Sequence, residues 1–190
     1  MESLTHEDKT FEKINYTGKT IKGREFQSCV FKKCDFSDSD FSFNRFMDCQ
    51  FDSCNLSMIK LRGTTLSGVV FVNCKIMGVI FSDCDNFNFT PQFDSCILDY
   101  ASFMGKKMLK TSWFKSSLKE VNFAQANLAG SVLDQSDLTD AVFNQTDLTG
   151  ADLSTALNYT IDPELNTIKK ATFSTFGLSG LLTRYQIKIV

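Results

Sequence analysis

The sequence has few histidines, no long apolar runs and, over one stretch, no positive charge. Its one histidine, His6, leaves no ready histidine-based acid, base or nucleophile arrangement. No apolar run exceeds a few residues, which is too short to span a bilayer. The N-terminal "MESLTHEDKTFEK" has no apolar region of the kind a signal peptide needs. We therefore expect a cytoplasmic protein that makes no contact with a membrane.

Motifs that carry chemistry are absent as well. The sequence contains no Gly-rich phosphate loop, HExxH, GxSxG or CxxC. Its carboxylates are expected mainly on solvated outer faces. We therefore predict that the protein is not an enzyme and has no catalytic residues, cofactor or metal. An enzyme remains an alternative that would need a surface pocket.

What the sequence does have is a period of five. Every fifth residue from Phe11 to Phe81 is apolar or aromatic, and after a slip of two the pattern continues from Phe93 to Leu153. Neither a helix, with a period of 3.6, nor a half-buried strand, with a period of 2, needs this spacing. Such regular self-similarity indicates a repeat architecture.

The composition of each group of five indicates how the chain folds. The residue two before each apolar centre is usually small, and the two residues after the centre are polar or Gly. Two side chains in five then point inward, so the chain must turn a corner every five residues. Four corners close a coil of twenty residues, and twenty-eight repeats give seven coils stacked by strand-like hydrogen bonds.

This pattern resembles that of the pentapeptide-repeat family, in which a small residue, Asp or Asn, and Leu or Phe precede two polar residues. The segments "ADLST", "TDLTG", "SDLTD" and "CDFSD" fit it. The resemblance implies an all-β fold, a right-handed quadrilateral parallel β-helix. We expect a lead-in at 1–10, the β-helix at 11–155, and a C-terminal helical or extended cap with a dimerisation segment at 156–190.

Seven cysteines could indicate disulfides, a metal site or a redox site. Each, however, keeps the spacing of the small inward position that Ala, Ser or Thr fills elsewhere, two residues before a centre in every case but Cys84, which lies at the slip. Three of them, Cys34, Cys54 and Cys74, are twenty residues apart and should stack on one face. We therefore interpret the cysteines as buried free thiols that pack as small apolar groups.

Residues 120–164 contain eight acidic residues and no Lys or Arg. Glu120 and Asp140 are twenty residues apart and should lie on adjacent coils. Simple solubility, together with Asp residues that cap corners, accounts for Asp137, Asp147 and Asp152 but not for the absence of basic residues. We favour an acidic face that binds a basic partner surface, one built for DNA. Its residues are Glu120, Asp134, Asp137, Asp140, Asp147 and Asp152.

The repeat is interrupted at 85–92, where the slip occurs, and we consider a second interruption at 104–112. The first could be a bulge within one coil or a small projecting loop, and it carries Phe87 and Phe89. The second places Lys106 in an inward position, which suggests a local departure from the coil. Either these segments are simply solvated or they form contact loops, with Phe87, Phe89, Lys106, Lys107 and Lys110 as the contact residues.

The pattern fades after Leu153. The segment "GLSGLLTRYQIKIV" could form a short helix that carries Leu178, Leu181, Leu182 and Tyr185. The end of a β-helix exposes unpaired strand edges that need a cover. A cap and a dimer interface are both reasonable roles, and we favour both together.

A narrower resemblance concerns two segments. "ASFMGKKMLKTSWFKSSLKEVNFAQANL" (101–128) is similar to the middle of Qnr-type quinolone-resistance proteins, and "NYTIDPELNTI" resembles the tail of McbG-type microcin immunity proteins. The resemblance implies a homodimer joined at its C-terminal ends. It also implies a DNA-imitating protein that binds DNA gyrase or topoisomerase IV, not nucleic acid itself, and protects it from inhibitors. A scaffold with an unrelated protein partner is the alternative.

Overall fold

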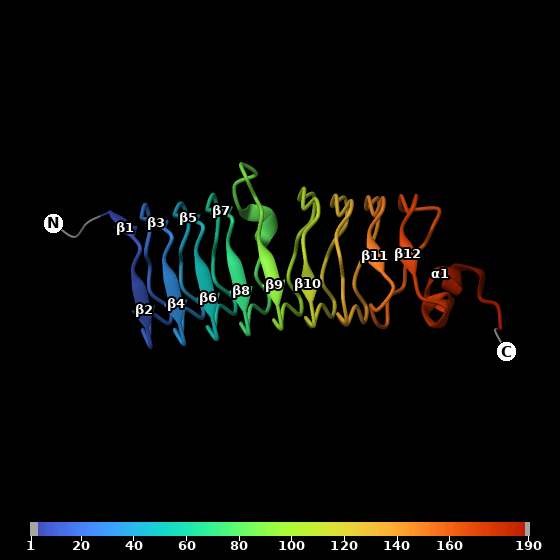
Figure 1. Cartoon of the computed structure of the whole chain (residues 1–190), viewed down its shortest axis with the longest axis horizontal. Coiled ribbons are helices and arrows are strands. Elements are labelled where there is room, and N and C mark those ends of the chain that lie inside the picture. The colour runs from blue at the N-terminus through green and yellow to red at the C-terminus, as the bar shows by residue number, and fades with distance from the viewer. Residues whose placement is uncertain (1–3, 189–190) are drawn as a thin grey trace.

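The computed structural model of the chain describes residues 4–188 and forms a rod of stacked coils (Figure 1). It is a parallel β-solenoid of about eight turns with one short C-terminal helix. Each coil has four short sides, and the same side of successive coils forms one ladder. We number these four faces in the order in which the chain passes through them.

Faces 1 and 2 contain the strands. Face 1 begins with four parallel strands: β1 (Thr5–Glu7), β3 (Glu25–Gln27), β5 (Arg45–Met47) and β7 (Thr65–Ser67). Face 2 is longer and continues toward the C-terminus through β11 and β12. Its strands are β2 (Thr10–Glu12), β4 (Val30–Lys32), β6 (Gln50–Asp52), β8 (Val70–Val72), β9 (Gln92–Asp94), β10 (Trp113–Phe114), β11 (Asp152–Leu153) and β12 (Thr172–Phe173).

Faces 3 and 4 are held by isolated parallel bridges at twenty-residue steps, such as Asn15 to Asp35 and Thr20 to Asp40. The step becomes twenty-two residues across the slip, where Lys75 pairs with Ile97 and Ile80 with Ser102. The ladders therefore absorb the two extra residues and regain their register.

Each corner is made by the residue two after an inward centre. Ser28, Lys33, Asp38 and Phe43, at successive corners of one coil, have φ between 52° and 61°. This left-handed conformation costs an L-residue about 1–2 kcal/mol, which explains the preference for Gly and polar residues there. Corners of this kind recur at almost every fifth residue and give the coil its square outline.

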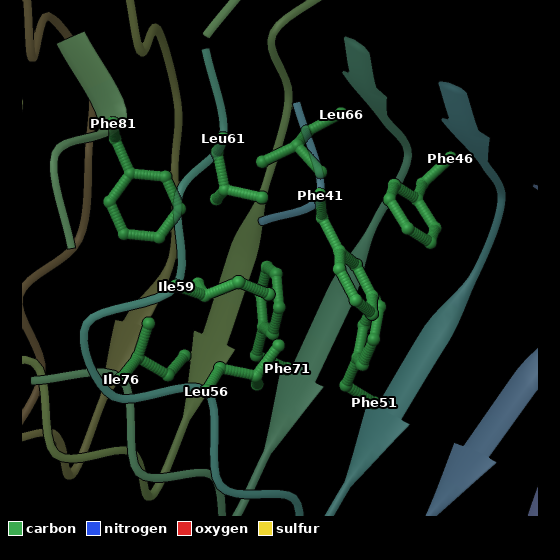
Figure 2. A pocket seen from close by; sticks show the side chains of 10 residues that line it. All are labelled: Phe41, Phe46, Phe51, Leu56, Ile59, Leu61, Leu66, Phe71, Ile76 and Phe81. Carbon is green, nitrogen blue, oxygen red and sulfur yellow. The ribbon is translucent and has the colours of Figure 1, made fainter. Parts of the chain in front are cut away.

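The interior is filled by side chains. On face 2 the rings of Phe31, Phe51 and Phe71 stack at centroid separations of 4.6 and 5.2 Å, close to the ~4.8 Å spacing of strands in a sheet. Figure 2 shows Phe, Leu and Ile side chains from four successive sides converging on one another. The space left among them is about 10 Å³, no more than one water molecule needs.

The solenoid extends beyond the expected limits of 11 and 155. Strand β1 pairs with β3 before Phe11, and β12 pairs with β11 after Leu153, so there are about eight turns and not seven. Residues 1–3 and 189–190, at the ends of the expected lead-in and cap, lie outside the described residues.

The possible second interruption at 104–112 does not occur, and the structure describes all of these residues. Lys107 bridges to Asn127 and Ser112 to Val132, as the coil requires. The first interruption, in contrast, does leave the coil. The 3₁₀ turn Phe81–Asp83 leads into a loop that projects beyond the outline of the rod between β8 and β9 (Figure 1).

The C-terminal end is covered by the 3₁₀ turn Thr175–Gly177, the helix α1 (Ser179–Leu182) and the 3₁₀ turn Thr183–Tyr185. Gly180 is buried, and its carbonyl accepts a hydrogen bond from the Ile161 backbone N–H at 3.0 Å. Within residues 4–188, no helix is long and apolar enough to cross a membrane.

Candidate partner-binding surfaces

Glu120 and Asp140 occupy the edge between faces 3 and 4 on adjacent coils. The Glu120 backbone N–H donates to the Thr139 carbonyl at 2.9 Å, which fixes this register. Both residues are exposed, and neither side chain makes a hydrogen bond or ion pair with any residue between 4 and 188. Their charges are therefore available to a partner.

Asp137, Asp147 and Asp152 have a different role. Each accepts a hydrogen bond, at 2.9–3.1 Å, from the backbone N–H two residues on and so holds the turn at its corner. Asn127 makes the same contact with Ala129, so the position needs an acceptor oxygen and not a charge. These three aspartates support the repeat itself, as expected from their position before a centre.

The six acidic residues do not share one face, which corrects the expected acidic face. Asp147 is in the ladder of face 1, Asp152 in that of face 2 and Asp137 in that of face 3. Asp134 lies on face 2 near the corner that leads to face 3, and its Oδ1 accepts a hydrogen bond of 2.6 Å from Thr155. Positions twenty residues apart share a face, and of these six only Glu120 and Asp140 are so spaced. The unpaired charge of the six is that of Glu120 and Asp140, on the edge between faces 3 and 4.

Asp137 is the most strongly stabilised carboxylate of this set. Burial opposes its ionisation, but hydrogen bonds from Thr139 and Asn158 and the Lys119 ammonium at 3.3 Å outweigh that effect. Together they lower the pKa of Asp137 to about 2. Asp137 is thus already neutralised by a neighbour, unlike Glu120 and Asp140.

The projecting loop separates the two aromatic residues predicted to act together. Phe87 is 65% exposed, whereas Phe89 is buried and contributes to the core. The Phe87 backbone N–H donates to Asp85 Oδ1 at 3.0 Å, which orders the start of the loop. Only Phe87 of this pair is positioned to contact a partner.

Lys106 supports the loop from inside the rod. It is 1% exposed, and its Nζ donates to the Cys84 carbonyl at 2.6 Å and to Asn86 Oδ1 at 2.8 Å. The Phe89 ring lies 4.9 Å from the same ammonium, and burial lowers the pKa of Lys106. Lys106 is therefore a structural residue, which corrects its assignment as a surface contact. Lys107 and Lys110 are exposed.

The cysteines are buried free thiols, as the sequence predicted. Cys34, Cys54 and Cys74 stack on face 3. The Cys34 backbone N–H donates to Cys54 Sγ, and the Cys54 backbone N–H donates to Cys74 Sγ, each at 3.4 Å. Burial raises the pKa of Cys49 to about 11 and that of Cys84 to about 12, so these thiols stay protonated. Residues 4–188 contain no group of three His, Cys, Asp or Glu that could hold a metal ion.

At the C-terminal end, two of the four predicted dimerisation residues face solvent. Leu178 and Tyr185 are exposed, whereas Leu181 packs against the core and Leu182 is half-buried. Sequence reasoning missed Phe176, which is 96% exposed. It lies outside the repeat, so no periodic position indicated its orientation.

A positive group from the cap neutralises part of the acidic stretch. Arg184 Nη1 lies 2.9 Å from both Asp162 Oδ2 and Glu164 Oε2. The hydrogen bond to Asp162 and the charge of Glu164 raise the pKa of Arg184. Hence the absence of Lys and Arg between 120 and 164 in the sequence does not leave every carboxylate unpaired in space.

Two family models match the chain: one described as pentapeptide repeats (8 copies) over residues 116–154, and one described as a pentapeptide repeat region over residues 24–103. Similar solved structures include two of trypsin-treated variants of QnrB1, a plasmid-mediated fluoroquinolone resistance protein. One has a TM-score of 0.69 at 19% identity and covers 95% of this chain and 100% of that one. The other has a TM-score of 0.57 at 22% identity, with coverages of 98% and 91%. No curated protein sequence gives a significant match.

Proposed function

We propose a function from the premise that this chain belongs to the pentapeptide-repeat family. In this proposal the protein binds a bacterial type II topoisomerase, DNA gyrase or topoisomerase IV, by imitating DNA. Binding protects the enzyme from inhibitors such as quinolones or peptide toxins. The role is one of binding in the cytoplasm, without catalysis and without direct contact with nucleic acid.

The observation that carries the proposal is the pair of unpaired carboxylates on adjacent coils of a narrow rod. Glu120 and Asp140 repeat at the coil spacing of ~4.8 Å, with no Lys or Arg between residues 120 and 164. Duplex DNA is also a narrow rod with regularly spaced negative charge, 3.4 Å apart along each strand. A protein surface built to bind DNA is therefore complementary to this edge.

The likeness to QnrB1 supports the same proposal at the level of the fold. QnrB1 is described as a fluoroquinolone resistance protein, and its structure covers nearly the whole of this chain. A fold alone does not fix a partner, so the proposal depends on the surface chemistry of this chain.

We further propose that two copies join through their C-terminal ends. Phe176, Leu178 and Tyr185 expose apolar surface at the end of the rod. Isologous contact between two such ends would bury these side chains. It would also cover the end of the solenoid.

One observation favours the alternative, a scaffold for an unrelated protein partner. Asp137, Asp147 and Asp152 each hold a backbone turn. Any rod built from this repeat would carry some acidity of this kind, whatever it binds.

A supercoiling assay distinguishes the two functions. Purified gyrase is inhibited by a fluoroquinolone, and the protein is added over a wide concentration range. The proposal predicts recovery of supercoiling. Absence of protection at every concentration, together with a pull-down that contains no topoisomerase subunit, would favour the scaffold.

A further inference from the structure

One edge of the rod combines apolar and acidic side chains in a fixed order. The edge between faces 3 and 4 is formed by the residues two after each face 3 centre. From Gly18 to Glu120, these residues donate their backbone N–H to the next coil, as in Met58 to Met77 and Tyr100 to Lys119, both at 2.9 Å. From the N-terminal end, the edge reads Gly18, Asp38, Met58, Gly78, Tyr100, Glu120 and Asp140.

The middle of this edge exposes apolar surface. Met58 is 56% exposed and Tyr100 57%. Ile80 on face 4 and Ile97 on face 3 are exposed on the two adjoining sides. Contiguous exposed apolar side chains mark interaction sites, and Met and Tyr are enriched at the centres of protein interfaces.

The corners of this edge do not all carry large side chains. Met58 and Tyr100 have φ of 59° and 64°, the left-handed region that disfavours bulky residues. Gly18 and Gly78 occupy equivalent positions on the same edge. Phe43 has the same backbone conformation and exposure on another edge, and the Met58 side chain packs over Gly78 of the next coil. It is therefore the gathering of exposed apolar groups on this edge, beside unpaired carboxylates, that indicates a role outside the fold.

Carboxylates flank this apolar centre on both sides. Asp38 lies on the N-terminal side, and Glu120 and Asp140 lie on the C-terminal side. None of the three makes a side-chain hydrogen bond or ion pair within residues 4–188. An apolar core with a polar rim is the usual anatomy of a protein interface. Here the carboxylates on the edge itself are unpaired, whereas Lys60 and Lys75 are exposed on the two adjoining faces and Lys119 is paired with Asp137.

We propose that this edge docks a protein surface that has an apolar centre flanked by Lys or Arg. The inference rests on the proposed function and deepens it: the topoisomerase surface contacts Met58 and Tyr100 as well as the carboxylates. Imitation of DNA by charge alone would require no such apolar contact. Binding therefore has a component that salt does not remove.

The test measures the dissociation constant for purified gyrase at about 50 mM and about 300 mM salt, conditions between which purely electrostatic binding weakens steeply. The variants are Met58→Asn, Tyr100→Asn and the double variant. Asn tolerates left-handed backbone, so each variant should fold. We expect Tyr100→Asn to weaken binding at least about tenfold, as for a central aromatic residue, and by the same factor at both salt concentrations.

Two control variants sharpen the result. In the double variant Glu120→Gln, Asp140→Asn, the loss of affinity for gyrase should be large at low salt. It should be smaller at high salt, because screening removes the effect of the charges. Phe43 is also exposed, with φ of 61°, but it lies on the edge between faces 4 and 1. Phe43→Asn should leave the affinity unchanged.

The outcomes separate the two proposals. If the wild-type protein does not bind gyrase, the proposed function fails and this inference falls with it. If it binds and Tyr100→Asn binds equally well, or Phe43→Asn weakens binding as much, only the docking edge is overturned. Sedimentation of the variants gives one more check: loss of self-association in Tyr100→Asn would show that the edge contacts a second copy instead.

Discussion

The two halves of the rod have the same backbone but different cores and surfaces. Before the projecting loop, the core is built from Phe and Cys, with rings stacked from coil to coil, such as Phe26 on Phe46 at 4.9 Å. After Trp113 it is built mainly from Leu with Ala, Ser and Thr, as at Leu128 and Leu133. The first half carries charges of both signs, whereas residues 120–164 contain only acidic ones. Because the coil accommodates both cores, its geometry leaves the outer positions free to vary with function.

The largest expected effect tests the contrast between the two cores. Phe51→Ala removes a ring that stacks between Phe31 and Phe71 and should lower the free energy of unfolding by about 3–5 kcal/mol. Leu133→Ala, at the equivalent position of face 2 in the other half, should cost about 1 kcal/mol less because no aromatic pair is lost. Guanidinium unfolding of both variants measures the difference. Equal losses would show that stacking adds nothing to burial.

The junction between the halves is tested by Lys106→Ala. This change leaves the Cys84 carbonyl and the Asn86 amide oxygen without their donor and should cost about 1–3 kcal/mol. Hydrogen exchange should increase in residues 85–90. The matched control is Lys107→Ala, whose side chain is exposed and whose effect should stay within about 0.5 kcal/mol. Unchanged exchange in the loop would contradict the role given to Lys106.

The period of five predicted the solenoid, its inward positions and the buried cysteines correctly, because burial repeats with the coil. It missed the first and last turns of the solenoid, before Phe11 and after Leu153, for a physical reason. His6 takes a centre position in β1 but is not apolar, and after Leu153 the buried residues Tyr159 and Asn166 no longer keep the spacing. The backbone ladder continues where the side-chain pattern does not.

The surface was less predictable. Lys106 broke the pattern, but sequence could not show that a projecting loop brings acceptors to it. Because each coil has twenty residues, the spacing in the sequence alone could have shown that Asp147 and Asp152 lie on other faces than the edge of Glu120 and Asp140. The sequence could not have shown that Phe176 is exposed, since its exposure depends on how the cap packs.

A smaller effect concerns pH and distinguishes paired from unpaired carboxylates. The pKa of Asp137 is about 2 in the folded protein and near 3.8 otherwise. Its charge therefore contributes stability above pH 4, and this contribution is lost as pH falls toward 2. Asp137→Asn should cost about 1 kcal/mol at pH 7 and nothing near pH 2. Unfolding curves at both pH values test this, and a difference that persists near pH 2 would contradict it.

The smallest effect on stability is expected for the residues assigned to function. Reversing Glu120 and Asp140 to Lys should change the unfolding free energy by about 0.5 kcal/mol or less per site and preserve the β-rich circular dichroism spectrum. The same reversals should abolish binding to gyrase. Reversal of Asp52 and Asp94, acidic residues on face 2 that lie outside residues 120–164, is the matched control and should leave binding intact.

The most direct test of the central claim is displacement of DNA from gyrase. Increasing amounts of the protein are added to a gyrase complex with labelled duplex DNA, and the bound DNA is measured. If the edge of Glu120 and Asp140 imitates DNA, the wild-type protein displaces the duplex, and the double reversal of Glu120 and Asp140 to Lys does not. If the wild-type protein binds gyrase while all the DNA stays bound, the claim of DNA imitation is contradicted.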